Sequence, residues 1–275
     1  MKIIRCISKR LAITLLLLGL FVLATMQSLA VAGATYHFRV PIYGVPTPAS
    51  LQAPPSYAIA NAYATLPGAV DFEGLYPNET LEIWFKTTQY GILFNTTGSP
   101  WGIWPPTKGY DPYLYVGTDG LLRGGAWSGA SSVITCTGKS VQDGRWHFAT
   151  LSLSSNRQSV YLDGGLCGTA AISLEPWQPS GYSYIGGGEG GGEASNWPGY
   201  NISGWVRFQG DWYGVAVWKV TRTATQVTAD MKQIAPVAPG LVVYYPVNGG
   251  SGSALKDASP NGNTAALSAP NWVGR

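Results

Sequence analysis

Charged side chains are scarce in this chain of 275 residues, at 11% of the composition, whereas about a quarter is typical of globular proteins. The surface must therefore be built largely from Gly, Ser, Thr, Asn and Tyr, as on many extracellular β-proteins. Basic residues are fewer still beyond the N-terminal segment, because Lys2, Arg5, Lys9 and Arg10 lie within it and leave 13 Lys and Arg against 14 Asp and Glu. A balance so close to neutral offers no basic surface to a nucleic acid.

A long apolar run occurs at the N-terminus, from Leu11 to Met26. Basic residues precede it and the small-x-small triplet Ala30-Val31-Ala32 follows it, which predicts a signal peptide over residues 1–32. The run is shorter than the about 20 residues of a spanning helix, although retention as an N-terminal anchor stays open. In either case we expect an exported chain at the cell surface or outside the cell, with no membrane contact after cleavage of the signal.

Cysteine is also rare, with three in the chain. Cys6 leaves with the signal, so Cys136 and Cys167 remain as a pair in an exported protein. We predict a disulfide between them, because a meander of three strands could bring the two together. Two buried free thiols are the alternative.

The residues for hydrolytic chemistry are sparse. The chain has two histidines, His37 and His147, and His147 lies within a predicted strand, which leaves little for a Ser-His-Asp site. A glycosidase needs two carboxylates about 5–10 Å apart across a cleft. The nearest approach is Asp71 and Glu73, which share a face but have no third acid beside them. We therefore expect that the protein is not an enzyme.

Short apolar segments separated by Gly, Pro and Asn turns predict an all-β sandwich. A first strand is predicted over Tyr36–Val45, before a proline-rich stretch. The later strands are expected at Tyr63–Leu66, Ala69–Phe72, Thr80–Thr87, Gly91–Asn95, Tyr113–Thr118, Leu121–Ala126, Ser132–Thr137, Trp146–Leu153, Ser159–Leu162, Tyr182–Ile185, Trp205–Phe208, Trp212–Lys219 and Leu241–Tyr245. One short helix is predicted over Thr225–Ile234, with Thr225 as its N-cap.

Four segments together resemble the laminin-G-like, concanavalin A-like lectin/glucanase family. They are DGRWHFATLSLSSNRQSVYLDGGLCG (143–168), TLEIWFKT (80–87), YIGGG (184–188) and FQGDWYGVAVWKVTRTATQV (208–227). The resemblance implies a jelly roll of two antiparallel sheets with one short helix, and a module that binds sugars or surfaces. Trp84, Trp146 and Trp218 lie within predicted strands, so we expect them to belong to the core. Family members commonly carry an acidic pair within the closing strand. This chain has Tyr213 and Gly214 at those positions, so we expect no role that depends on the charge of such a pair.

The expected domain organisation follows from these matches. Residues 33–61 hold the first strand and the proline-rich segment, residues 62–235 form the jelly roll, and residues 236–275 form a strand-forming tail. The tail is similar to the segment that normally begins such a module. We expect it either to complete its own sandwich or to pair with a neighbouring molecule.

Two aromatic-rich segments are candidates for sugar recognition, since sugar rings stack on aromatic faces and need a few placed hydrogen bonds. One is the glycine-rich stretch 186–200 and the other is 101–115; a flexible linker and partly buried packing are the alternatives. The candidate ligand-binding residues are Glu189, Glu193, Trp197, Tyr200, Trp101 and Trp104.

Calcium is the cofactor that the resemblance implies, with Asp257, Asn261 and Asn263 in the tail as candidate oxygen ligands. An Asx-rich turn held by its own hydrogen bonds is the alternative. Three glycosylation sequons begin at Asn78, Asn95 and Asn201.

Taken together, these features predict an exported, non-catalytic glycan- or surface-binding module whose partner is a carbohydrate or a cell-surface ligand. The alternative is a structural subunit of an extracellular assembly, such as a filament, surface layer or virion, that self-associates through its C-terminal segment.

Overall fold

The computed structural model describes residues 56–103, 110–127, 132–173, 181–190 and 196–275, with two short strands nearer the N-terminus. The chain divides into the units Met1–Ser50 and Leu51–Arg275. In the first unit, β1 (Leu29–Val31) pairs antiparallel with β2 (Ala34–Tyr36). The strand predicted over Tyr36–Val45 lies outside the described residues beyond Tyr36. No helix in the described part of the chain is long and apolar enough to cross a membrane.

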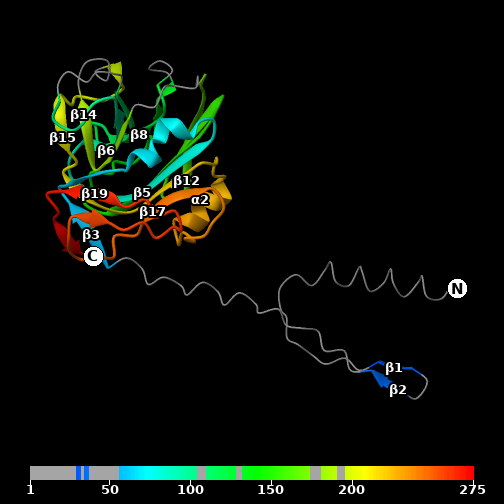
Figure 1. The fold of residues 1–275 in the computed structure, drawn as a ribbon. Helices are drawn as coiled ribbons and strands as arrows, with labels where there is room; N and C mark the ends of the chain where they lie inside the picture. Colours follow the sequence, from blue (N-terminus) through cyan, green and yellow to red (C-terminus); the bar gives the residue numbers. More distant parts are fainter. Residues whose placement is uncertain are drawn as a thin grey trace. The chain divides into compact units, whose positions relative to one another are not determined.

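The second unit is a sandwich of two large antiparallel sheets (Figure 1). The first sheet has β5 (Glu79–Thr87) and β16 (Gly210–Trp218) at its centre, and β10 (Trp146–Ser154), β11 (Arg157–Leu162) and β12 (Gly165–Ala171) follow on one side. On the other side of β16 lie β3 (Tyr57–Ala60), β20 (Trp272–Gly274) and β17 (Leu241–Tyr245).

The second sheet runs in the order β18 (Ala254–Leu255), β19 (Ala265–Ser268), β4 (Tyr63–Thr65), β13 (Tyr182–Ile185), β6 (Gly91–Thr97), β7 (Tyr110–Val116), β8 (Leu122–Gly124) and β9 (Ile134–Thr135). Period-two alternation turns one set of side chains from each sheet inward, so that Leu81 and Ile83 of β5 share a single core with Leu114 and Val116 of β7. A small additional sheet pairs β14 (Gly187–Gly190) with β15 (Gly204–Arg207).

The all-β prediction and the family expectation of two antiparallel sheets are therefore confirmed, with corrections in detail. The segment predicted as a strand over Ala69–Phe72 instead forms parts of two 3-10 turns, Gly68–Val70 and Phe72–Leu75. The helix, α2, spans Ala224–Asp230, and its N-cap is Thr223, not Thr225. Thr223 and Gln226 form a reciprocal capping box, which satisfies two of the backbone N–H groups at the helix start.

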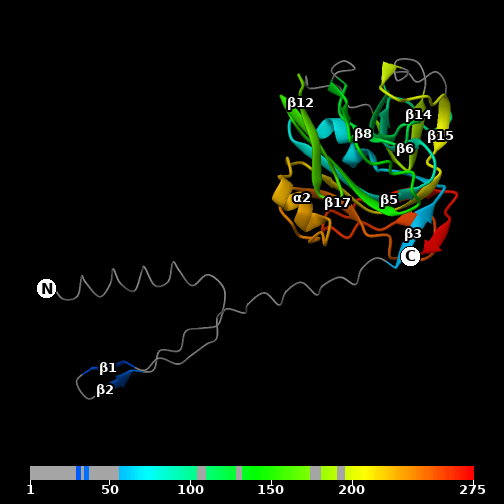
Figure 2. The same ribbon diagram turned by 180° about the vertical axis from the view of Figure 1, so that it is seen from behind.

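The tail completes its own sandwich. β17 pairs with β16, β19 with β4, and β20 with β3. Figure 1 and Figure 2 both show the chain end beside β3, whereas β12 lies toward the opposite margin. Of the two arrangements open for this segment, the structure shows closure within the chain.

The segment 143–164 that carries the family resemblance is held by a buried histidine. His147 lies between two carboxylates, with Nδ1 3.0 Å from Asp163 and Nε2 3.0 Å from Asp143. Burial lowers the pKa of His147, but the hydrogen bonds to Asp163 and Asp143 outweigh it and raise the pKa overall. Asp163 also accepts a hydrogen bond from the backbone N–H of Phe148 at 3.0 Å. The histidine is therefore part of the framework, and the same hydrogen bonds fix the turn between β11 and β12.

The predicted disulfide is confirmed. Cys136 and Cys167 are bonded, with their Cα atoms 4.8 Å apart. Cys136 directly follows β9 of the second sheet and Cys167 lies in β12 of the first. The bond therefore joins the two sheets at one margin of the sandwich.

Two of the three tryptophans assigned to the core are only half-buried. Trp218 is fully buried, but Trp84 and Trp146 remain partly exposed. Both contact Tyr213, Trp84 in a stacked arrangement and Trp146 edge-on. Alternation along β5 points Trp84 away from Leu81 and Ile83, so these rings cover the outer surface of the sheet and not its core.

Candidate functional site

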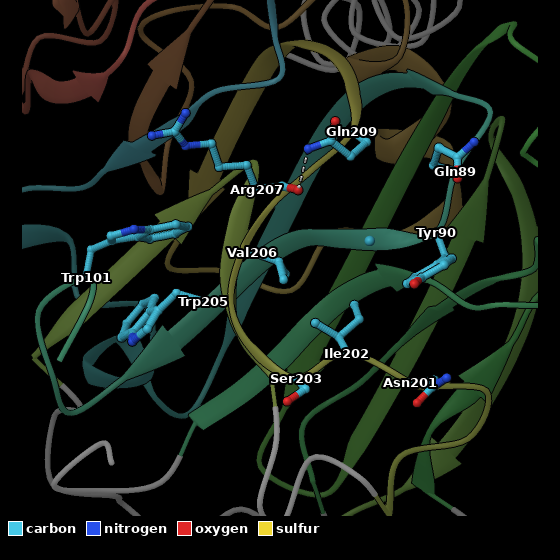
Figure 3. Close-up of a pocket in the computed structure, with 11 residues that line it drawn as sticks. Gln89, Tyr90, Trp101, Asn201, Ile202, Ser203, Trp205, Val206, Arg207 and Gln209 are labelled. Carbon is cyan, nitrogen blue, oxygen red and sulfur yellow. Dashed lines mark hydrogen bonds between the residues drawn. The ribbon is translucent and has the colours of Figure 1, made fainter. Parts of the chain in front are cut away.

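A pocket of about 780 Å³ opens beside β15 (Figure 3). Its walls come from the turn after β5, the loop after β6, the residues before β15 and β15 itself. Trp101 and Trp205 lie on one side of the close-up, and Gln89 and Tyr90 lie on the other. The lining residues are Gln89, Tyr90, Gly91, Trp101, Asn201, Ile202, Ser203, Trp205, Val206, Arg207 and Gln209.

The aromatic side of the pocket is built on a stack of rings. Trp101 lies parallel to Tyr63, with ring centroids 3.6 Å apart. Trp205 tilts against Trp101 at 4.9 Å and donates its indole N–H to the carbonyl of Ile103 at 3.1 Å. Contacts on several sides therefore hold both indoles in place, so little side-chain entropy remains to be lost on binding.

Glycine makes this packing possible. A Cβ atom at Gly187 would lie 3.0 Å from the ring of Trp101 and 2.7 Å from the carbonyl oxygen of Val206. Gly188 and Gly190 are equally close to Asn95 and Ile202. In the described part of the glycine-rich stretch, the glycines of β14 thus form a tightly packed strand and not a flexible linker.

The polar side of the pocket is fixed by one threonine. The Thr87 hydroxyl donates to the carbonyl of Gln209 at 2.7 Å and accepts from the backbone N–H of Gln89 at 2.9 Å. It thereby ties together the two turns that carry Gln89 and Gln209 on the pocket wall. Tyr90 is 43% exposed, so its ring and hydroxyl face solvent within reach of a ligand.

The aromatic residues predicted in the glycine-rich stretch do not have free faces. Trp197 and Tyr200 are 3% and 7% exposed and pack with Tyr115 in a small cluster. The Tyr200 hydroxyl donates to the carbonyl of Glu189 at 3.3 Å. The prediction that these two rings stack on a sugar is wrong, because hydrophobic packing has already used their faces.

Of the other predicted site residues, Trp101 lines the pocket, whereas Trp104 and Glu193 lie outside the described residues. Glu189 is fully buried, and neither of its carboxylate oxygens has a hydrogen-bond partner. Burial raises the pKa of this carboxyl from 4.5 to about 7. Glu189 is paired with Trp205 across the β14–β15 ladder, so the two side chains share a face of this small sheet, but Glu189 is enclosed and does not line the pocket.

Two other buried carboxyl groups belong to the framework. Glu82 accepts a hydrogen bond from the indole N–H of Trp218 at 2.8 Å, and Asp230 accepts from Arg222 at 2.8 Å. Burial, followed by the charge of Asp230, raises the pKa of Glu82. These contacts hold α2 against the outer surface of the first sheet.

The three tail residues predicted as calcium ligands do not fit the ion. The Asp257 carboxylate accepts hydrogen bonds from the backbone N–H groups of Tyr244, Ser259 and Asn263, and from the Ser259 hydroxyl. Asn261 and Asn263 both direct their amide N–H groups to the carbonyl of Val242. The described residues contain no group of three His, Cys, Asp or Glu side chains arranged for a metal. The turn is of the Asx-rich type, held by its own hydrogen bonds.

The three sequons differ sharply in exposure. Asn78 and Asn201 are exposed, and Asn201 lines the pocket. Asn95 is fully buried and accepts a hydrogen bond from the backbone N–H of Glu189 at 3.3 Å. A glycan therefore does not fit on the Asn95 side chain in the folded protein, whereas Asn78 and Asn201 leave room for one.

The sequence reasoning missed most of the pocket. Trp205 and Arg207 occur at alternate positions of a predicted strand, with Val206 between them, and an indole and a guanidinium on one face of a strand are the signal that could have identified it. Gln89 and Tyr90 lie in a turn whose sequence has no such signal, because only the fold brings it beside β15.

The comparisons with known proteins agree with this architecture. The model of the concanavalin A-like lectin/glucanases superfamily, in its laminin-G form, matches residues 59–228. The chain belongs to this superfamily. No curated protein sequence matches this member of the superfamily.

Solved structures share its fold. A candidate carbohydrate-binding protein from Bacteroides ovatus is 20% identical, with a TM-score of 0.57 over 80% of this chain and 60% of that one. This chain therefore covers about 60% of the length of the Bacteroides ovatus protein. The heptameric SAP-like pentraxin of Limulus polyphemus is 19% identical, with a TM-score of 0.40 over 80% of this chain and 85% of the pentraxin. At 20% identity the likeness to the Bacteroides ovatus protein shows the fold alone.

Proposed function

We propose that this protein is an exported, non-catalytic carbohydrate-binding module and that the pocket beside β15 is its ligand site. The observation that carries the proposal is the fixed pair Trp101 and Trp205, set opposite Gln89 and Tyr90 in a hollow of about 780 Å³. Apolar ring faces with a few amide and hydroxyl groups around them are the features that sugars require. The fold shared with a candidate carbohydrate-binding protein supports the same conclusion.

Export is supported by the covalent structure. Disulfides persist in oxidising compartments and are rare in the cytosol, and Cys136 and Cys167 form one here. The predicted signal peptide over residues 1–32 is consistent with the same compartment. N-terminal sequencing of the mature protein is expected to begin after Ala32, whereas retention of the apolar segment would indicate an anchor.

The binding site is tested with a glycan array and calorimetry. Trp205→Ala is expected to reduce the affinity for the best glycan at least tenfold while the protein stays folded. The matched control is Trp127→Ala, since Trp127 is 36% exposed and lies outside the pocket. Equal affinities of Trp205→Ala and wild type for a bound glycan would contradict the assignment of the pocket.

The same samples test the non-catalytic role and the structural alternative. A binding module leaves its glycan intact after long incubation, and chromatography of the recovered glycan would reveal any cleavage. It should also elute as a monomer or small oligomer. An assembly subunit would polymerise on electron microscopy grids and leave the array blank, which would overturn the proposed function.

A further inference from the structure

Among the residues that line the pocket, Arg207 carries a charge. The other lining residues are uncharged, and none is an acid. The ion pairs in the described residues do not include Arg207. The nearest acid along the chain, Asp211, is neutralised by Lys86, with Nζ and Oδ2 2.7 Å apart. The pocket therefore carries a positive charge with no counter-charge of its own.

The arginine is placed beside the aromatic wall. Its guanidinium lies 5.9 Å from the ring centroid of Tyr63, and Tyr63 is the ring on which Trp101 stacks. In Figure 3 the Arg207 side chain extends toward the side of the pocket that Trp101 occupies. The guanidinium therefore lies over Tyr63, on the far side of Trp101 from Trp205, at the margin of the pocket where a charged substituent of a bound ligand could contact it.

From this arrangement we infer that the pocket selects glycans that carry an anionic group, a carboxylate or a sulfate, and that Arg207 determines this preference. The inference rests on the proposed function, because it names the class of ligand for the same site. A guanidinium presents two parallel N–H donors that match both oxyanions. Because Arg207 is exposed, water and salt screen its charge, so its preference for an anion rests on these two donors and weakens as salt is raised.

The competing interpretation is that Arg207 only packs over Tyr63. At 5.9 Å the guanidinium is close to the outer limit of about 6 Å for a cation–π contact, so Tyr63 attracts it only weakly. Arg207 is exposed on β15, so its donors are not engaged in holding the fold. The contact with Tyr63 positions the side chain without satisfying its charge.

The test uses matched glycan pairs and calorimetry. One pair is an oligogalacturonate and its methyl ester, and the other is a sulfated galactan oligosaccharide and its desulfated form. We expect the wild-type protein to bind the acidic member of at least one pair about tenfold more tightly, as for one hydrogen-bonded charge pair. The preferred pair distinguishes a carboxylate from a sulfate, and the preference should shrink as salt is raised.

Arg207→Gln should abolish the acidic preference, mainly by weakening the binding of the acidic member. Arg207→Lys should retain part of the preference, because it keeps the charge but loses the planar pair of donors. The control is Arg145→Gln, which removes the charge of an exposed arginine outside the pocket and should change nothing.

The outcomes separate the inference from the proposed function. Equal binding of acidic and neutral members by the wild type, or an unchanged preference in Arg207→Gln, overturns the inference and leaves carbohydrate binding in place. Failure to bind any glycan of the array overturns the proposed function itself.

Discussion

The carboxyl group of Glu189 allows a direct test of how β14 is held against the second sheet. The side chain is fully buried, and both carboxylate oxygens lack a hydrogen-bond partner. Burial raises its pKa from 4.5 to about 7 in the folded protein. In the unfolded chain the same group titrates near its ordinary value, because water surrounds it. Between these two pH values the folded state holds a proton that the unfolded state has released.

The sign and size of the effect follow from this difference in proton binding. The contribution of Glu189 to stability is fully present below about pH 4.5 and is lost as the pH rises through about 7. A tenfold change in proton affinity corresponds to about 1.4 kcal/mol, so the shift from 4.5 to about 7 corresponds to about 3 kcal/mol.

Glu189→Gln removes the charge and keeps the shape. We expect the variant and the wild type to have similar free energies of unfolding near pH 4, where both side chains are neutral. Near pH 8 the variant should be more stable by about 3 kcal/mol, as measured by urea unfolding followed through tryptophan fluorescence. Burial also raises the pKa values of Glu79 and Glu82, but these acids are present in both proteins and cancel in the difference. A stability difference that stays constant from pH 4 to pH 8 would show that the carboxyl is solvated and refute the reasoning.

Three further changes test the framework. Replacing Cys136 and Cys167 with serine should lower the free energy of unfolding by about 4 kcal/mol, because the disulfide closes a loop across 31 positions; a loss below 1 kcal/mol would contradict this. Thr223→Ala should cost about 1 kcal/mol in urea unfolding through loss of the capping box, and no loss would mean that the helix start is held by other contacts. Deleting residues 240–275 should give an unfolded chain by circular dichroism, since it removes partners of both sheets; a stable folded monomer would refute it.

Much of the fold was predictable because the sequence patterns are local. The apolar-rich runs Glu79–Thr87 and Trp146–Ser154 are buried along almost their whole length, and the Asp163-Gly164 turn is specified by two residues with positive φ. The pairing of β17 with β16 was not predictable as a unique arrangement. Both faces of β17 are apolar, so the pattern alone does not distinguish pairing within the chain from pairing with a neighbouring molecule.

The candidate site was harder to predict than the fold. Trp197 and Tyr200 have the same local sequence character as the pocket residues, but long-range packing buries them. The sequence pattern placed Trp205 in a strand but did not indicate that its ring lines a pocket. An aromatic residue in a glycine-rich segment indicates either packing or recognition, and only the neighbouring strands determine which of the two applies.

The pairing of the tail has a consequence for how the protein reaches its folded state. Ile59 of β3 pairs with Trp272 and Ala64 of β4 pairs with Leu267, so both sheets keep an open edge until the ribosome has made the tail. Contacts this distant in sequence form slowly. Both sheets can therefore be completed only after residues 265–274 have left the ribosome, so the last strands to be synthesised close the edges of β3 and β4.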